Sequence, residues 1–206
     1  MDSEPFFEKT IAKRVIHKGK LITLREDVVK SVKGQFNREI VEHPGAVAII
    51  PIIGKDVVVI KQYRHAIERA ICEPPAGTLG NGEDPEECAR RELLEETGYM
   101  GSSFQKILEL YPAPGYSTEV IYLYLATNLT KTKQRPEKDE HIKVLTIDLE
   151  NVLQMIERKE IKDAKSIIGI LYLKNFVIPN RQCSRQNTKV CKNDGLTSHF
   201  NKKLAS

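Results

Sequence analysis

The decapeptide RRELLEETGY, residues 90–99, constrains this chain more than any other feature of its sequence. It closes a segment with clear helix boundaries. Asp84 is a good N-cap, Pro85 suits the first turn, and Gly98 is a natural C-terminal stop. The pattern therefore predicts a helix over residues 85–97.

Three glutamates crowd one face of this predicted helix. Glu92 and Glu96 are four positions apart and Glu95 lies beside them, so their like charges cost an isolated helix a few tenths of a kcal/mol. A solvated acidic face, partly compensated by Arg91, is one explanation. The other is that a bound cation supplies the missing charge, because clustered carboxylates suit a hard divalent ion such as Mg²⁺.

The flanking residues favour the cation. Together with the helix they resemble the Nudix box, G-x5-E-x7-R-E-U-x-E-E-x-G-U, in which U is bulky and apolar. The matching residues are Gly77, Glu83, Arg91, Glu92, Glu95, Glu96 and Gly98, and Tyr99 alone fits loosely because it is aromatic. The resemblance implies a hydrolase that binds Mg²⁺, or Mn²⁺ in its place, and cleaves a diphosphate.

The same resemblance implies a role for each box residue. Glu92 and Glu96 would be the main metal ligands, and Glu95 a third; Glu95 and Glu96 would also serve catalysis. The carbonyl of Ala76, in the loop before the helix, would face the metal. The supporting residues would be Gly77, Glu83, Arg91 and Gly98.

Beyond the box, the chain looks like the ADP-ribose pyrophosphatase subfamily from about Phe7 to Phe176. The stretches that carry this likeness are REIVEHPGAVAIIPI, VVVIKQYRHAIERAICEPPAGTL and YPAPGYSTEVIYLYLA. The last of these places Pro114 sixteen residues after Gly98, near the usual position of a subfamily proline. The implied reaction is hydrolysis of ADP-ribose to AMP and ribose 5-phosphate.

The likeness also implies substrate-binding residues. These are Arg38, Glu39, Arg64, Glu73, Pro114 and Gly115. Arg64 would contact the diphosphate, because a guanidinium fork suits phosphate oxygens. Glu73 could instead be a structural carboxylate that caps a loop, and Arg38 and Glu39 could be exposed strand residues.

The general base is expected in the acidic segment RPEKDEHIKV, residues 135–144. Relatives carry two acids in an acid-x-acid pattern there. Here Lys138 stands at the first position and Glu140 at the second, so Glu140 is the leading candidate. Asp139 and Glu137 are the alternatives.

The resemblance predicts an α/β Nudix fold, a mixed β-sheet sandwiched between helices. Besides residues 85–97, the expected helices are 149–161 and 163–176. The expected strands are 21–32, 36–43, 45–53, 56–63, 103–111, 119–127 and 142–149. Three parts follow: a β-rich extension that builds a homodimer (1–44), the Nudix domain (45–176) and a basic, flexible tail (177–206).

Composition limits the class of protein. The net charge of +4 comes from the tail, which carries six lysines and arginines against one aspartate, so a nucleic-acid partner is not expected. No apolar run is long enough to span a membrane, and four cysteines suggest a reducing, cytoplasmic setting. Two alternatives stay open. One is cleavage of a nucleotide sugar or dinucleoside polyphosphate, and the other is a domain that senses ADP-ribose without cleaving it.

Overall fold

The computed structural model describes residues 7–136 and 140–177, and the chain divides into two units, residues 1–170 and 171–206. The helices are α1 (Pro85–Thr97), α2 (Leu149–Glu157) and α3 (Ala164–Tyr172), with a 3₁₀ turn at His65–Ile67 and a π turn at Leu173–Val177. The strands are β1 (Lys9–Lys18), β2 (Thr23–Ser31), β3 (Gly34–Glu42), β4 (Ala46–Ile53), β5 (Asp56–Arg64), β6 (Arg69–Glu73), β7 (Ala76–Thr78), β8 (Tyr99–Leu110), β9 (Ile121–Lys131) and β10 (Lys143–Asp148).

The main sheet has seven strands and is mixed, as predicted. Its order is β10-β5-β4-β9-β8, with β6 paired to β5 and β7 paired to β4. The β4–β9 pairing is parallel, whereas the other pairings are antiparallel. Strand β4 lies at the centre and five of its eight residues are buried, which fits its nearly continuous apolar sequence.

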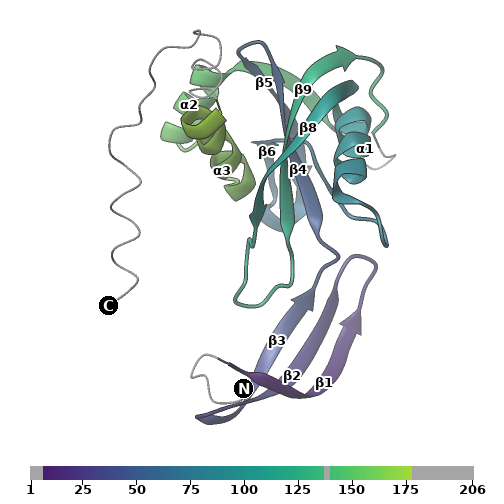
Figure 1. The fold of residues 1–206 in the computed structure, drawn as a ribbon, viewed down its shortest axis with the longest axis vertical. Coiled ribbons are helices and arrows are strands. Elements are labelled where there is room, and N and C mark those ends of the chain that lie inside the picture. The colour runs from purple at the N-terminus through teal and green to yellow at the C-terminus, as the bar shows by residue number, and fades with distance from the viewer. Residues whose placement is uncertain (1–6, 137–139, 178–206) are drawn as a thin grey trace, which may run out of the picture. The chain divides into compact units, whose positions relative to one another are not determined.

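Helices cover both faces of this sheet, with α1 on one side and α2 and α3 on the other (Figure 1). On the α1 side, Val47 and Ile49 pack with Leu93 in a fully buried cluster. On the other side, Gly169 of α3 approaches Ile50 so closely that a Cβ would lie 2.6 Å from its Cδ1. The predicted sandwich of sheet and helices is confirmed.

Helix α1 begins and ends where the sequence predicts. The Asp84 carboxylate accepts the backbone N–H groups of Glu86 and Glu87, and Gly98 closes the helix in the left-handed conformation, at φ 69°. A Cβ at Gly98 would also lie 2.6 Å from the backbone nitrogen of Gln134. Glycine is therefore required here both for its conformation and for space.

Three strands were missing from the sequence prediction. Strand β1 carries bulges between Thr10 and Ala12 and between Val15 and His17, which interrupt the period-2 pattern that marks a strand. Strand β6 begins directly after the 3₁₀ turn. Strand β7 lies in a segment that was expected to be a loop, because its pairing with β4 depends on backbone hydrogen bonds and not on strand-forming side chains.

Strands β1, β2 and β3 form a separate antiparallel sheet in the expected N-terminal extension. The division of the chain at residues 44 and 176 stays a prediction. The predicted tail lies outside the described residues apart from Val177. Within residues 7–136 and 140–177, no helix is both long and apolar enough to cross a membrane.

Candidate active site

The three box glutamates lie on one face of α1, at increasing depth. The side chain of Glu95 is 34% exposed and that of Glu92 is 13% exposed, whereas Glu96 is 1% exposed. Helix α1 packs on the sheet through Leu93. Glu96, three positions later on the same face, is therefore brought close to the strands. The helix thus presents a buried carboxylate, a half-buried one and a more exposed one.

Glu96 contacts the sheet directly. Its Oε2 accepts the backbone N–H of Ala76 at 2.8 Å, which joins α1 to β7. The pKa of Glu96 is raised to about 8, chiefly by burial and also by the negative charges of Glu92 and Glu140, whereas the Ala76 N–H and the charge of Arg64 oppose the rise. Without a cation, a proton is therefore the favoured counter-charge for this carboxylate at neutral pH.

Glu92 is packed against Gly77, the middle residue of β7. A Cβ at Gly77 would lie 2.0 Å from both Cδ and Oε1 of Glu92, so residue 77 must be glycine for this carboxylate to keep its place. Burial raises the pKa of Glu92, and the charges of Glu95 and Glu140 add to the effect against the attraction of Arg91. The opening glycine of the box is thus explained by contact with its first helical glutamate.

Arg91 gathers the acidic side chains of the box. Its guanidinium binds Glu83 through two hydrogen bonds of 2.9 and 3.0 Å, and its Nη1 donates to Glu92 at 2.6 Å and to Glu95 at 3.2 Å. The Arg91 hydrogen bonds, with the Gly80 N–H, lower the pKa of Glu83 to about 2. Arg91 thus links Glu83, in the loop before α1, to two glutamates of the helix, and the supporting role of both residues stays a prediction.

The three box carboxylates suit a hard divalent cation, although their oxygens do not meet around one point. Carboxylate oxygens are the ligands that Mg²⁺ and Mn²⁺ prefer. Burial, together with the neighbouring negative charges, raises the pKa of Glu92 and Glu96, so a bound cation would relieve a real cost of ionising them. Among the described residues, no three acidic, histidine or cysteine side chains are arranged to hold a metal ion. Arg91 holds one oxygen of Glu92, which would have to exchange this partner for the ion.

An open cleft with about 490 Å³ of empty space lies beside β7. Its lining includes Arg64, Lys165, Ala76, Gly77, His43 and Glu119. Since Ala76 and Gly77 also contact the box glutamates, the cleft adjoins the acidic face of α1. The short strand β7 thus lies between the acidic face of α1 and a cleft lined by two positively charged side chains, Arg64 and Lys165.

Arg64, the last residue of β5, forms an ion pair with Glu73, the last residue of β6. The Arg64 Nε donates to Glu73 Oε1 at 2.6 Å, and Glu73 is 1% exposed. Burial opposes the charge of Arg64, but its bond to Glu73 and the charges of Glu73, Glu96 and Asp163 raise its pKa above the ordinary value. Arg64 lines the cleft, as its predicted role requires, whereas Glu73 lies behind it.

Glu140 lies close enough to α1 for its charge to raise the pKa of both Glu92 and Glu96. The leading candidate for the general base is thus brought to the box glutamates from a segment more than forty residues away in the chain. The alternatives Glu137 and Asp139, together with Lys138, lie outside the described residues.

Besides Glu73, four other predicted substrate residues are not part of the cleft lining. Arg38, on β3, pairs with Glu8 at 2.5 Å, and its neighbour Glu39 is exposed. Pro114 and Gly115 lie in the connection between β8 and β9. Their contact with a substrate stays a prediction.

The connection that holds Pro114 and Gly115 is bound to β3. The Val41 N–H donates to the Tyr116 carbonyl at 2.8 Å, and the Thr118 N–H donates to the Val41 carbonyl at 3.0 Å. The N-terminal sheet and the loop that precedes β9 are therefore joined by backbone hydrogen bonds.

A family model described as the NUDIX domain matches residues 42–168. The chain belongs to the Nudix family. A relative named ADP-ribose pyrophosphatase, from Bacillus subtilis (strain 168), is 42% identical over 81% of this chain and 92% of the relative. A protein named methanol dehydrogenase activator, from Bacillus methanolicus, is 41% identical over 82% of this chain and 93% of its own length.

A solved structure titled "Crystal structure of ADP compounds hydrolase" matches the fold with a TM-score of 0.75. It covers 84% of this chain and 95% of that one at 19% sequence identity. At this identity the likeness shows the fold alone, and it agrees with the Nudix sandwich described above.

Three residues with ionisable side chains in the cleft lining of this Nudix protein were missed by the sequence prediction. They are His43, Glu119 and Lys165. His43 Nδ1 accepts the N–H of Gly45 at 3.1 Å and lies 3.9 Å from a Glu119 oxygen. Both His43 and Glu119 stand inside stretches that carry the subfamily likeness. Lys165 lies in an ordinary amphipathic pattern and gave no signal of its own.

Proposed function

We propose that this Nudix protein hydrolyses the diphosphate of ADP-ribose to AMP and ribose 5-phosphate. The observation that carries the proposal is the position of Arg64, in a cleft whose wall, Ala76–Gly77, also contacts Glu92 and Glu96. A diphosphate needs positive charge and a metal site side by side, and this arrangement offers both. The choice of ADP-ribose is supported by the 42% identical relative that bears the name of this activity.

Each residue has a proposed task. Glu92, Glu95 and Glu96 would hold the metal ion together with the Ala76 carbonyl. Mg²⁺, or Mn²⁺ in its place, would neutralise the diphosphate and lower the pKa of a bound water.

The protein's own groups would supply the remaining chemistry. The guanidinium of Arg64 would bind a phosphate oxygen, because its planar fork matches phosphate geometry. Glu140 would accept the proton of the attacking water, since it lies near the box glutamates. Arg38 and Glu39 would meet the adenosine, and Pro114 and Gly115 the terminal ribose.

A homodimer and a cytoplasmic location belong to the same proposal. The exposed apolar side chains of β1, among them Ile11, Val15 and Ile16, support the dimer because such surface is usually covered by a partner. Cys72 and Cys88 are free thiols, which supports a reducing compartment. Membrane and nucleic-acid partners are not part of the proposal.

A substrate panel tests the activity. The purified protein is incubated with Mg²⁺ and, in separate reactions, ADP-ribose, ADP-glucose, NADH, diadenosine polyphosphates and nucleoside triphosphates, and the products are separated by chromatography. AMP and ribose 5-phosphate from ADP-ribose, at the highest kcat/KM of the panel, are the expected result. A higher kcat/KM for a nucleotide sugar or a dinucleoside polyphosphate would replace the substrate. Binding of ADP-ribose without any product would favour a sensing domain.

A further inference from the structure

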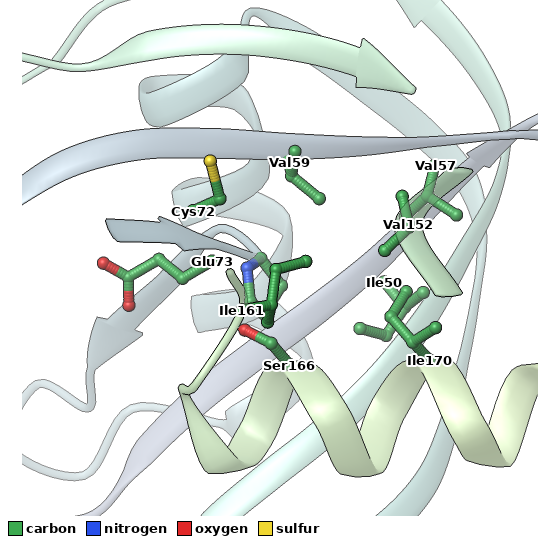
Figure 2. Close-up of a pocket in the computed structure, with 10 residues that line it drawn as sticks. Ile50, Val57, Val59, Cys72, Glu73, Val152, Ile161, Ser166 and Ile170 are labelled. Carbon is green, nitrogen blue, oxygen red and sulfur yellow. The ribbon is translucent and has the colours of Figure 1, made fainter. Parts of the chain in front are cut away.

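Behind the cleft, a buried carboxylate lies between two of the positively charged side chains that line it. Glu73, at the end of β6, is 1% exposed; its Oε1 accepts from Arg64 Nε at 2.6 Å and its Oε2 accepts from Lys165 Nζ at 2.7 Å. Figure 2 shows this carboxylate turned away from the apolar pocket that Val57, Val152 and their neighbours line. Both oxygens of Glu73 are thus used, each by a different cation.

Lys165 is itself held in place by the start of α3. Its Nζ donates to Asp163 Oδ1 at 3.0 Å, and the other Asp163 oxygen accepts the Ser166 N–H at 3.0 Å and its hydroxyl at 2.5 Å. The Lys165 side chain is 15% exposed. The result is a chain of alternating charge, Arg64–Glu73–Lys165–Asp163, anchored on the first turn of α3. These four residues are thus linked by three ion pairs in series.

The division of Glu73 between two cations decides how Arg64 is held. An arginine facing a free carboxylate often forms two parallel hydrogen bonds that occupy both oxygens. Here Lys165 donates to Oε2, and Arg64 donates to Oε1 through Nε alone. Within the described residues, no hydrogen bond is made by the two terminal nitrogens of Arg64, which lines the cleft and is 38% exposed.

We propose that Lys165 is a positioning residue for diphosphate hydrolysis: by occupying Glu73 Oε2 it keeps the terminal nitrogens of Arg64 free for the substrate. The proposal rests on the proposed function, and it gives Glu73 an indirect role through Arg64. Without Lys165, the vacated oxygen of the buried Glu73 accepts a terminal Arg64 nitrogen, because an unpaired buried carboxylate oxygen is costly. The guanidinium then turns from the cleft toward Glu73.

A double-mutant cycle tests this chain of action. In Lys165→Met, kcat/KM for ADP-ribose is expected to fall about tenfold, mainly through a higher KM. In an Arg64→Ala background the same substitution is expected to change kcat/KM by less than about twofold, because the residue through which Lys165 acts is gone. Equal effects in both backgrounds would overturn the proposal and indicate that Lys165 contacts the diphosphate itself or acts elsewhere.

Three further variants separate positioning from a structural role. Lys165→Arg restores a cation on Glu73 and is expected to recover most of the lost kcat/KM. Glu73→Gln combined with Lys165→Met is expected to recover part of it, because an amide offers Arg64 one oxygen only. Lys162→Met removes an exposed lysine of the same segment and is expected to have no effect. A Lys165→Met defect that neither Lys165→Arg nor the Glu73→Gln combination relieves would contradict the mechanism.

A binding measurement keeps this test apart from that of the proposed activity. The Kd of inorganic pyrophosphate, measured by calorimetry in EDTA, is expected to rise in Lys165→Met and to be unaffected in Lys162→Met. If the wild-type protein binds pyrophosphate but leaves ADP-ribose intact, the proposed activity fails. The double-mutant cycle of Lys165 and Arg64 can then still be measured from the Kd of pyrophosphate. If the Kd of Lys165→Met equals that of the wild type, the positioning role fails.

Discussion

The carboxylate of Glu92 lies directly against the α-carbon of Gly77, so closely that a Cβ would stand 2.0 Å from its Oε1. This contact joins the short strand β7 to the acidic face of α1. It explains why a glycine and a glutamate fifteen residues apart belong to one motif. The neighbouring residue Ala76 makes the second connection, through its N–H and Glu96.

Replacing Gly77 by alanine should therefore damage the metal site while sparing the fold. The atoms in the way are the far end of a flexible side chain, so Glu92 can swing aside at little cost in stability. We expect Gly77→Ala to weaken Mg²⁺ binding about 10- to 100-fold, the usual loss when a ligand's support is removed. Calorimetry gives the metal affinity and thermal unfolding gives the stability.

The matched control for Gly77→Ala is the same substitution in a Glu92→Ala background, which lacks the carboxylate. In a Glu92→Ala background there is no carboxylate to displace, so Gly77→Ala should then leave metal affinity unchanged. A loss of affinity as large as that in the wild-type background would show that the alanine acts on something other than Glu92.

Glu96 should make the metal-free protein less stable as pH rises. Its pKa is raised from 4.5 to about 8, chiefly by burial, so between these values the folded chain keeps a proton that the unfolded chain has released. The free energy of unfolding therefore falls as pH rises through this window, by at most about 1.4 kcal/mol per pH unit. Urea titrations in EDTA across this range measure the slope.

Glu96→Gln isolates the contribution of that single carboxyl group. The amide cannot ionise, yet its oxygen can still accept the Ala76 N–H. We expect this variant to lose the part of the slope that Glu96 causes and to be more stable than the wild type at pH 8. It should also lose most Mg²⁺-dependent activity. A slope identical to that of the wild type would mean that Glu96 is already ionised in the folded chain.

Glu140→Gln should lower turnover while leaving the protein folded. Removing a general base costs a factor of about 10² to 10⁴ in kcat. The substitution also removes a negative charge that raises the pKa of Glu92 and Glu96, so both pKa values should fall. Steady-state kinetics is the measurement, with Glu137→Gln and Asp139→Asn as matched variants. Unchanged kcat in Glu140→Gln, with a loss in either of the other two, would move the base to that residue.

The parts of the fold that were predicted are those determined by residues close together in the sequence. The bounds of α1 follow from Asp84, Pro85 and Gly98, whose effects reach only a few residues along the chain. Strand β7 was missed because β4, some thirty residues away, supplies its hydrogen-bond partners. Strand β1 was missed because two bulges break its alternation.

The same distinction holds for the site. The box residues are close in sequence, and Glu140 lies near enough for its charge to raise the pKa of Glu92 and Glu96, while its role as the base stays a prediction. The link from Arg64 through Glu73 to Lys165 spans two strands and a helix, with 92 positions between Glu73 and Lys165. No periodicity or spacing reports a contact of this kind, so Lys165 could be found only in the folded chain.

The N-terminal sheet provides the last prediction, that of a homodimer. On β1, Val15 is 60% exposed and Ile11 is 46% exposed, and burying such side chains drives most protein association. We expect Ile11→Asp combined with Val15→Asp to convert the dimer to monomer, because each change places a charge where apolar contact is needed. Light scattering coupled to gel filtration gives the mass, and Lys13→Gln on the same strand is the control. A wild-type protein that elutes as a monomer, or a double variant that stays dimeric, would remove β1 from the interface.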